Sequence, residues 1–347
     1  MLAPNPVGDA VMFTPTIRAV RTGFPDAELT LLARPAAAAV LTPNPWGARV
    51  LVESGRLRET AAALRGARAD LIVIGPNSFR GGVLARLSGA ARRVGYARDG
   101  RGWLLTDRLR PPRGPNGSFA VTPAIDYYLA LAERLGCDAT DRRMALSVAD
   151  ADAASADDLL ARKAPGDGPL VLLNPGAAFG GSKLYPAGRF AAVADALVER
   201  HDARIVINAG PGEGEIAAAV AKSMNHAVAT NLADERNSLG LVKAIAARSD
   251  LMITNDTGPR HFAAAFGVPV VTIFGATDPG WTTIYYDRER IVRVDVPCGP
   301  CQQKECRFPP DHPEFHQCML KIPPEMVLAA AEELLRDRPP AGTTRGA

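Results

Sequence analysis

The sequence predicts an α/β protein with two domains built on parallel sheets, and three observations support this. The chain has 347 residues, more than one hydrophobic core usually organises, so two domains of about 150 residues each are expected. Short apolar segments alternate with helical patterns, which is typical of parallel sheets covered by helices. A segment dense in proline and glycine, residues 163–169, separates the two halves.

These boundaries define the expected organisation. We predict an N-terminal domain over residues 1–162, a linker over 163–169 and a C-terminal domain over 170–322. A final amphipathic helix is predicted over 323–336, packing back on the N-terminal domain, and residues 337–347 are expected to form a frayed tail. Only Met1, Leu2 and Ala3 precede the first loop, so the first strand is expected to be shortened or missing.

Composition excludes several classes of protein. Hydrophobic residues make up 47% of the chain, and 40 basic against 37 acidic residues leave a net charge of +3. That charge is too small to indicate nucleic-acid binding as a global property. No apolar run approaches the roughly 18 residues of a membrane span, and the N-terminus has no leader pattern. A cytoplasmic protein without a transmembrane segment is expected.

The stretch from Leu251 to Thr277 reads as strand, turn, helix and strand. The apolar run Leu251–Thr254 breaks at Asn255-Asp-Thr-Gly258, where Gly258 lets the backbone approach a ligand. A helix opening at Pro259 is expected to present free N–H groups and a positive dipole end, which suit a phosphate. An ordinary strand-turn-helix unit explains the pattern equally well when it is taken alone.

A second glycine-rich turn follows the apolar run that begins at Leu170. Gly176, Gly180 and Gly181 allow backbone amides to face an anion, and Lys183 can place a positive charge on a phosphate oxygen. The order of residues is not that of a Walker loop, and an ordinary loop with an exposed lysine is the alternative. Glu213, just beyond the next strand, is a candidate partner for ribose hydroxyls.

Two further regions carry chemistry in the first half. Asp9 begins a helical pattern and acts either as a helix cap or as a catalytic carboxylate. Between residues 80 and 113 the chain has nine arginines against two acidic residues. This segment is either a solvated surface or a cradle for an anionic acceptor, because arginine forks bind phosphate and carboxylate groups in pairs of hydrogen bonds.

Five separated blocks of the sequence resemble one known family. They are Pro-Asn-x-x-Gly-Asp-Ala-Val-Met at residues 4–12, Asn77-Ser-Phe-Arg80 with Arg93-Val-Gly-Tyr96, Pro175-Gly-Ala with Lys183-x-Tyr-Pro, Asp256-Thr-Gly-Pro-x-His261, and the late cysteine-rich segment. In this order they are similar to the ADP-heptose lipopolysaccharide heptosyltransferases of glycosyltransferase family nine, particularly its heptosyltransferase II branch. The resemblance covers nearly the whole chain and implies the GT-B fold, two Rossmann-like domains facing across a cleft.

The resemblance also implies roles for individual residues. Asp9 takes the place of the general base, and Lys183 takes the place of the catalytic diphosphate-binding lysine. The donor-binding positions are Gly176, Glu213, Asp256, Thr257, Gly258 and His261. The acceptor-binding positions are Arg80 and Arg93. No cofactor and no catalytic metal are implied, because positive groups of the protein stabilise the leaving diphosphate.

The implied reaction is inverting transfer of heptose from ADP-heptose to the inner core of lipopolysaccharide. The expected partners are therefore the nucleotide-sugar donor and an anionic lipid A–core acceptor at the inner membrane surface, where the enzyme is expected to be cytoplasmic or peripheral. Two alternatives remain open at this stage. One is another GT-B nucleotide-sugar enzyme such as an epimerase, and the other is a catalytically silent nucleotide-sugar binding protein.

Two patterns in the sequence are similar to metal-binding motifs. Asp150-Ala-Asp152 spells the Asp-x-Asp motif of metal-dependent sugar transferases but opens a polar helix, so we do not assign it a metal. Four of the five cysteines are clustered late in the chain, at positions 298, 301, 306 and 318. A structural metal site and a set of free thiols are both compatible with their spacing.

Overall fold

The computed structural model describes residues 1–226 and 229–336 of the chain. It divides into two compact units. Unit 1 consists of Met1–Ser147 together with Gly280–Tyr285, and unit 2 consists of Val148–Pro279 together with residues 286–336. The tail expected over residues 337–347 lies outside the described residues.

Unit 1 is built on a parallel sheet. Its strands are β1 (Thr30–Ala33), β2 (Arg49–Val52), β3 (Leu71–Ile74), β4 (Arg92–Tyr96) and β5 (Asp107–Leu109). Leu2 forms single parallel bridges to Leu32 in β1 and to Ile74 in β3, and so joins the pair β1–β2 to the trio β3–β4–β5. Leu2 thus occupies the central position of the sheet as a stub, at the place where the first strand was expected to be shortened or missing.

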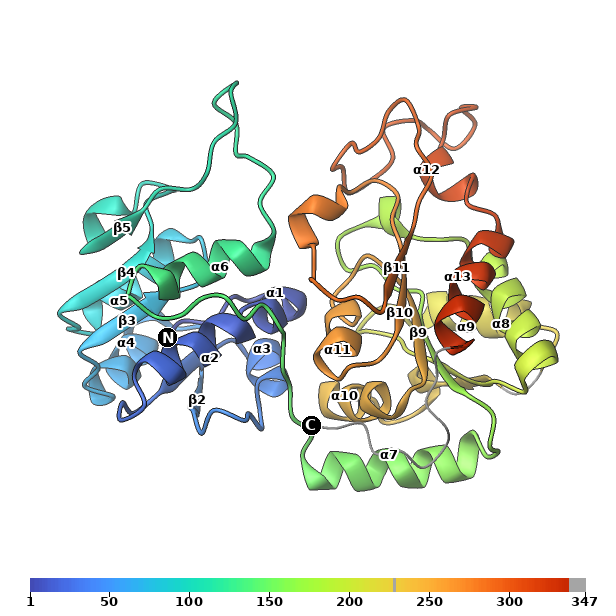
Figure 1. The fold of residues 1–347 in the computed structure, drawn as a ribbon, viewed down its shortest axis with the longest axis horizontal. Helices are drawn as coiled ribbons and strands as arrows, with labels where there is room; N and C mark the ends of the chain where they lie inside the picture. Colours follow the sequence, from blue (N-terminus) through green and yellow to red (C-terminus); the bar gives the residue numbers. More distant parts are fainter. Residues whose placement is uncertain (227–228, 337–347) are drawn as a thin grey trace. The chain divides into compact units, whose positions relative to one another are not determined.

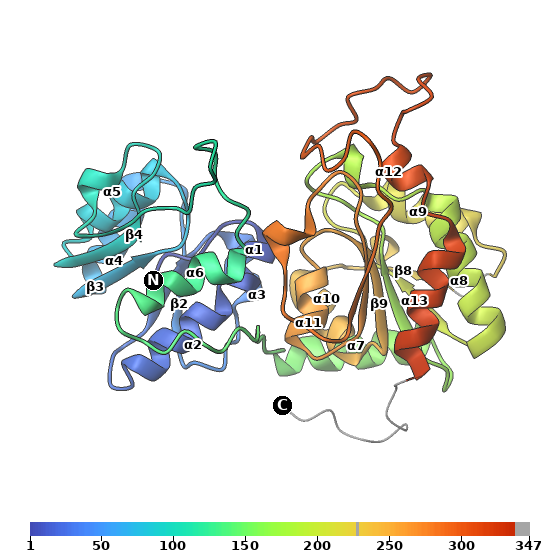
Figure 2. The same ribbon diagram turned by 45° about the horizontal axis from the view of Figure 1, so that its top comes forward.

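Helices cover this sheet. They are α1 (Val7–Met12), α2 (Thr14–Gly23), α3 (Pro35–Val40), α4 (Leu57–Gly66), α5 (Phe79–Leu87), the short 3-10 helix η1 (Gly102–Leu104) and α6 (Ala124–Glu133). α4 packs with α5, while α2 packs with α6 and α1 with α3, as Figure 2 shows. One core cluster joins the stub residue Leu2 to Ile74 of β3 and Leu84 of α5.

Unit 2 contains a six-stranded sheet in which all neighbouring strands are parallel. The strands are β6 (Leu170–Asn174), β7 (Arg204–Ile207), β8 (Ala229–Asn231), β9 (Leu251–Asn255), β10 (Val270–Ile273) and β11 (Glu289–Val292), in the order β11-β10-β9-β6-β7-β8. Every residue of β6, β9 and β10 is buried. Such continuous apolar strands are expected where helices cover both faces of a parallel sheet.

The helices of unit 2 are α7 (Asp150–Lys163), α8 (Ala187–His201), α9 (Gly214–Ser223), α10 (Leu239–Arg248), α11 (Arg260–Ala265), α12 (Gln317–Leu320) and α13 (Pro324–Arg336), with the 3-10 helices η2 (Gly181–Lys183) and η3 (Leu232–Asp234). A further 3-10 helix, η4 (Pro279–Thr282), lies where the chain passes into unit 1. α8, α9 and α13 lie on one face of the sheet and α10 and α11 on the other (Figure 1). Among the described residues, no helix combines the length and apolarity that crossing a bilayer requires.

The predicted domain boundary at residues 163–169 is wrong. α7 belongs to unit 2, because its buried Ala156, Leu159 and Leu160 face that unit and the helix packs against α10. An ion pair between Arg248 and Asp157 ties the two helices together. The boundary therefore falls between Ser147 and Val148, in an extended segment without the proline and glycine that signal a linker.

The predicted position of the last helix is also wrong. α13 packs against α8 and against β9, β10 and β11 of unit 2 rather than against the N-terminal domain. Its buried face, which includes Val327, Ala331 and Leu334, belongs to the core of unit 2. In the opposite direction, Gly280–Tyr285 comes from the second half of the sequence but joins unit 1, where the Tyr285 hydroxyl donates to Asp126.

Both sheets have the strand order of a doubly wound fold. In unit 2 the chain starts at β6, moves outward through β7 and β8, and returns to β9 on the other side of β6. In unit 1 it starts at the stub, moves through β1 and β2, and returns to β3 on the stub's other side. Ligands of such sheets bind at the carboxyl ends of the strands where the direction reverses.

Candidate active site

Lys183 and Asp256 meet at the reversal point of unit 2. Lys183 lies in η2, beyond the carboxyl end of β6, and Asp256 directly follows β9. The Lys183 Nζ lies 2.5 Å from Asp256 Oδ2 and 3.0 Å from the Asp256 carbonyl oxygen, to both of which it donates. Both side chains are buried, and the ammonium also lies 4.7 Å from the centre of the Phe179 ring. The sequence placed these two residues in one site, and the structure brings them into contact.

A buried network fixes Asp256 from its other side. Thr277 donates a hydrogen bond of 2.8 Å to Asp256 Oδ2. The fully buried Arg260 lies 3.6 Å from Asp256 Oδ1 and forms a two-point ion pair with Glu289, at 2.6 and 3.0 Å. Burial alone would raise the pKa of Asp256, but the charges of Lys183 and Arg260 outweigh burial and hold that pKa below its usual range. Asp256 is therefore a carboxylate that holds Lys183 in place.

The helix after this turn differs from the prediction. α11 has six residues, and the amides of Arg260 and His261 already donate to the carbonyls of Thr257 and Gly258. They are not the free N–H groups that the sequence suggested. Within the described part of the chain, the amides of Thr257 and Gly258 themselves have no backbone acceptor. The amides left to face an anion are thus those of the loop that precedes the helix.

His261 lies behind this turn as a neutral side chain. Burial lowers its pKa to about 3, and the positive charge of Arg260 acts in the same direction. Its Nδ1 is buried and has no hydrogen-bond partner among the described residues. A neutral imidazole with an unused ring nitrogen can accept or donate one hydrogen bond to a bound ligand.

Asparagines that sequence analysis did not single out hold the ends of the strands together. Asn255 donates 2.7 Å to the Pro175 carbonyl and accepts from the Tyr185 amide at 3.3 Å. Asn174 bridges Thr254 and Asn208 with hydrogen bonds of 3.1 and 2.6 Å. These contacts hold the loop after β6 against the end of β9. An asparagine at the end of a strand was the sequence signal from which these contacts could have been predicted.

Gly176 and Glu213 lie against each other. The Glu213 carboxylate accepts from the Gly210 amide at 3.0 Å, and a Cβ at position 176 would lie 2.1 Å from Glu213 Oε2. A side chain at 176 would therefore displace the Glu213 carboxylate from its present position. The structure therefore brings these two predicted donor-site residues together at the carboxyl ends of β6 and β7.

Asp9 lies in the first turn of α1, at the reversal point of unit 1. Its Oδ1 accepts a hydrogen bond of 2.9 Å from the hydroxyl of Tyr128 in α6. No side chain caps the start of α1, so the capping role considered for Asp9 is not observed. Burial raises the pKa of Asp9, and the hydrogen bond from Tyr128 acts in the opposite direction. Sequence analysis missed Tyr128, which is 119 residues away.

The two arginines predicted to bind the acceptor lie at different ends of the unit 1 sheet. Arg80 lies in the first turn of α5, beyond the carboxyl end of β3, and pairs with Glu53 at 2.7 Å. Arg93 lies near the amino end of β4, where its guanidinium donates to the carbonyls of Leu104 at 2.9 Å and Ala90 at 2.6 Å. These carbonyls hold the Arg93 guanidinium at the end of the sheet opposite the ligand end. The structure therefore argues against its predicted role in acceptor binding.

Arg101 is a further arginine with a clear structural task. Its side chain is fully buried and donates to the carbonyls of Pro76, Ser78 and Tyr96 and to the Asn77 side chain. It thereby fixes the loops after β3 and β4, which lie at the ligand end of the sheet. Nothing in the sequence around Arg101 distinguishes it from the other arginines of this segment, so this structural role could not be predicted.

The four late cysteines converge. Cys298, Cys301, Cys306 and Cys318 line one small cavity together with His316, and all four are free thiols. Among the described residues, no three His, Cys, Asp or Glu side chains are arranged to hold a metal ion. The segment that carries them contacts η2: the Ser182 amide donates to the Lys304 carbonyl and the Gly181 amide to Glu305. It therefore supports the turn that presents Lys183.

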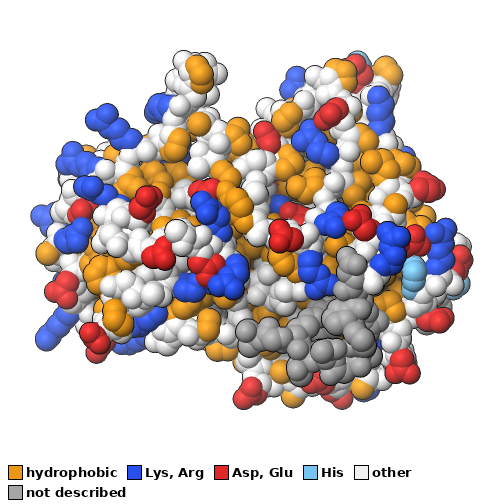
Figure 3. Space-filling model, in the orientation of Figure 1, with side chains coloured by type: hydrophobic (Ala, Val, Ile, Leu, Met, Phe, Trp, Pro, Cys, Tyr) orange, Lys and Arg blue, Asp and Glu red, His pale blue; other side chains and the backbone are white. Residues whose placement is uncertain are grey.

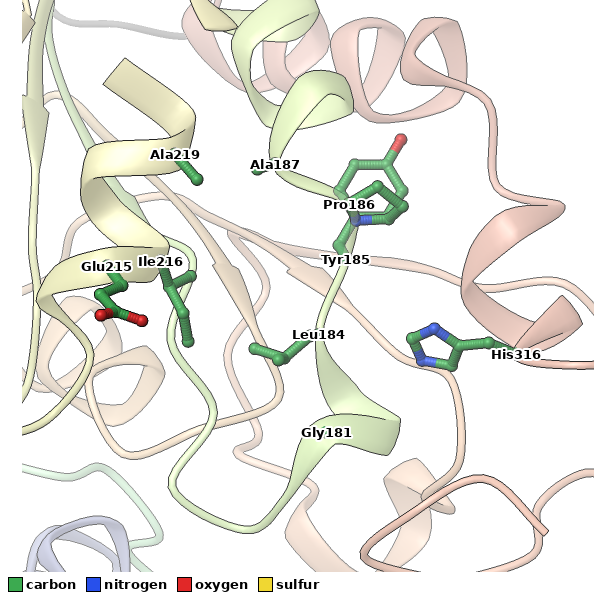
Figure 4. A pocket seen from close by; sticks show the side chains of 9 residues that line it. All are labelled: Gly181, Leu184, Tyr185, Pro186, Ala187, Glu215, Ile216, Ala219 and His316. Atoms are coloured by element: carbon green, nitrogen blue, oxygen red, sulfur yellow. The ribbon is translucent and has the colours of Figure 1, made fainter. Parts of the chain in front are cut away.

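A second cavity, of about 450 Å³, is lined by residues of this turn and of α9. Figure 4 shows Leu184 and Pro186 along it, with Glu215 of α9 at one side and the His316 ring at the other. None of the predicted donor-site residues lines it. The Lys183 side chain points instead to Asp256.

The chain is similar in sequence to one family of known proteins. Residues 57–312 match the family model described as glycosyltransferase family 9 (heptosyltransferase). The chain is 36% identical over 172 residues to lipooligosaccharide heptosyltransferase 2 of Campylobacter jejuni, a match that spans 48% of this chain and 51% of that protein. It is 25% identical to lipopolysaccharide heptosyltransferase 2 of Escherichia coli, over 96% of this chain and 97% of that protein.

The fold is also found among solved structures. The structure of E. coli ADP-heptose lps heptosyltransferase II superposes with a TM-score of 0.80 and 22% sequence identity, covering 96% of this chain and 97% of the other. The two-domain α/β fold predicted from the sequence is therefore confirmed.

Proposed function

Because this chain belongs to glycosyltransferase family 9, the heptosyltransferases, we propose that it transfers a heptose from ADP-heptose to the inner core of lipopolysaccharide. The observation that carries the proposal is the buried Lys183–Asp256 pair at the reversal point of the unit 2 sheet. A lysine fixed there by a carboxylate is suited to a diphosphate, since it offers a positive charge whose position is set before the ligand arrives.

Unit 2 binds the donor in this proposal. Lys183 contacts the diphosphate, and the amides of Thr257 and Gly258 face its oxygens. Glu213 interacts with the ribose and His261 donates or accepts one hydrogen bond at the same site. As the bond to the anomeric carbon breaks, negative charge grows on the leaving diphosphate, and the Lys183 ammonium stabilises it.

Asp9 of unit 1 serves as the general base. It accepts the proton of the acceptor hydroxyl as that oxygen attacks the anomeric carbon from the face opposite the diphosphate, which inverts the centre. Its raised pKa brings a carboxylate closer to the pH at which a base works best. Its place at the reversal point of the unit 1 sheet supports this role.

The acceptor side is basic. Residues 1–147 contain twenty arginines against twelve acidic residues, a net charge of +8, while the remainder of the chain carries −5. Figure 3 shows arginine side chains spread over the face of unit 1 that it draws, with fewer acidic side chains among them. We assign Arg80 to the anionic lipid A–core acceptor. Trp103 and Phe79, 68% and 48% exposed with ring centres 6.5 Å apart, are suited to contact the membrane surface that holds the acceptor.

The experiment that tests the function measures ADP release from ADP-heptose with and without a lipid A–core acceptor. A heptosyltransferase releases ADP only when the acceptor is present and adds one heptose mass to it. An epimerase would convert the donor without acceptor, and a binding protein would bind ADP-heptose and release nothing. Either of those results would overturn the proposal.

Asp9→Asn should lower turnover by roughly 10²–10⁴, the usual span for a lost general base. The affinity for ADP should stay near that of the wild type, because Asp9 belongs to the other unit. Steady-state kinetics with calorimetry of ADP binding checks both expectations. Near-normal turnover of this variant would remove Asp9 from the mechanism.

A further inference from the structure

Tyr128 is the side chain that contacts the proposed base. It lies in α6 with 7% of its surface exposed, and its hydroxyl donates to Asp9 Oδ1 at 2.9 Å. Its ring packs edge-on against Phe13, with centres 5.4 Å apart, and against Tyr127, with centres 5.9 Å apart. These two contacts fix the direction of the hydroxyl, so it reaches one carboxylate oxygen only.

The other oxygen of Asp9 remains for catalysis. No second hydrogen-bond partner of the Asp9 side chain occurs among residues 1–226 and 229–336. We propose that Tyr128 is a positioning residue that binds Oδ1, orients the carboxylate and keeps it ionised, leaving Oδ2 to receive the acceptor's proton. This inference rests on the proposed function, in which Asp9 is the base.

The electrostatics of the pair agree with this division of roles. Burial raises the pKa of Tyr128 well above its usual value, and the neighbouring charge of Asp9 raises it further. Tyr128 therefore keeps its proton and remains the donor. The other titratable groups that act on Tyr128 are the hydroxyls of Tyr127 and Tyr96, which are also protonated because burial raises the pKa of each.

Tyr128→Phe tests the proposal, since it removes the hydroxyl and keeps the ring. Without the donor the ionised carboxylate loses stabilisation, so the acidic limb of the kcat/KM profile should move to higher pH. At a fixed pH on that limb, kcat/KM should fall roughly 10- to 100-fold, the size of one hydrogen bond to a charged group. ADP binding by calorimetry should be unchanged, which also reports that unit 2 is folded.

Tyr96→Phe is the matched control. Tyr96 is also buried, but its hydroxyl donates 2.8 Å to the Tyr127 carbonyl and not to Asp9. Its loss should lower the thermal midpoint and leave the acidic limb where it is. If Tyr128→Phe behaves in the same way, Tyr128 is structural only and the inference is wrong.

The double variant of Asp9→Asn and Tyr128→Phe separates this inference from the proposed function. If Asp9→Asn is fully active, the proposed base is wrong and the inference falls with it. If Asp9→Asn lowers turnover as predicted, Tyr128→Phe should add no further loss in that background, because both changes act through one carboxylate. Independent, additive losses would overturn the positioning role while leaving Asp9 as the base.

Discussion

At the scale of single residues, the arrangement around Lys183 shows how a charge is kept ready for an anion. Burying an ammonium costs free energy unless a partner compensates it. Asp256 supplies that partner at 2.5 Å, and Thr277 and Arg260 hold Asp256 in turn. Lys183 is therefore fixed where a diphosphate is proposed to bind, and little conformational entropy remains to be lost on binding.

Lys183→Ala should raise the dissociation constant for ADP roughly 10- to 100-fold, as expected for one lost hydrogen bond between charged groups. It should also lower kcat, because the ammonium stabilises charge that grows in the transition state. Calorimetry and steady-state kinetics measure the two effects. Lys222→Ala is the control, since Lys222 is exposed at the end of α9. Equal ADP affinities for the two variants would exclude Lys183 from the donor site.

At the scale of elements, the segment carrying the cysteines acts on the site through η2. Lys304, Glu305 and His316 contact three backbone groups of the turn, at Gly181 and Ser182. The φ angle of Gly180 is +155°, and a Cβ there would lie 2.3 Å from the Lys304 carbonyl oxygen. The turn thus depends on a segment more than 120 residues away in the sequence.

Glu305→Ala should therefore weaken ADP binding without touching the ligand. It removes the acceptor of the Gly181 amide. Water replaces that acceptor, so the net loss of one hydrogen bond costs roughly 0.5–1.5 kcal/mol. The expected change in the dissociation constant is about 2- to 10-fold, measured by calorimetry. Glu325→Ala, at the start of α13, is the control. A dissociation constant like that of the control would mean that η2 holds its shape unaided.

Local sequence patterns predicted the elements of the fold better than they predicted which distant residues contact one another. The apolar run Leu251–Thr254 was expected to form a strand, and β9 covers Leu251–Asn255, because a short apolar run between helical patterns has few alternative structures. α7 was assigned to the wrong domain because residues 163–169 after it, which are dense in proline and glycine, resemble a linker. Tyr128 and Asp9 are 119 residues apart in the sequence, and no periodic pattern indicates a contact between residues so far apart.

At the scale of the whole molecule, the two units differ in net charge as well as in their proposed roles. Unit 1 draws its positive charge from arginine alone, since residues 1–147 contain no lysine. Several of these arginines are held by the protein itself, including Arg93 and Arg101. Arg80 lies at the ligand end of the sheet, with 31% of its side chain exposed and one carboxylate partner, Glu53. Net charge alone does not identify a binding residue, and Arg80 is proposed because of its position at the ligand end of the sheet.

The last prediction concerns how the acceptor is attracted to unit 1. If the arginines bind an anionic acceptor, its KM should rise with ionic strength, because added salt screens exposed charges. Arg80→Gln should raise the acceptor KM on the order of tenfold, the size of one charge-assisted hydrogen bond, and leave ADP affinity intact. The control is Arg86→Gln, since Arg86 is exposed in the last turn of the same helix.

Kinetics with varied acceptor at saturating ADP-heptose, at two salt concentrations, separate the possible outcomes. Arg80→Gln should also show a smaller salt dependence than the wild type, because one of the screened charges is gone. Loss of its pair with Glu53 would lower the stability of unit 1, which a thermal melt measures independently of KM. An acceptor KM that responds neither to salt nor to Arg80→Gln would mean that the arginines of unit 1 form a solvated surface and do not bind the acceptor.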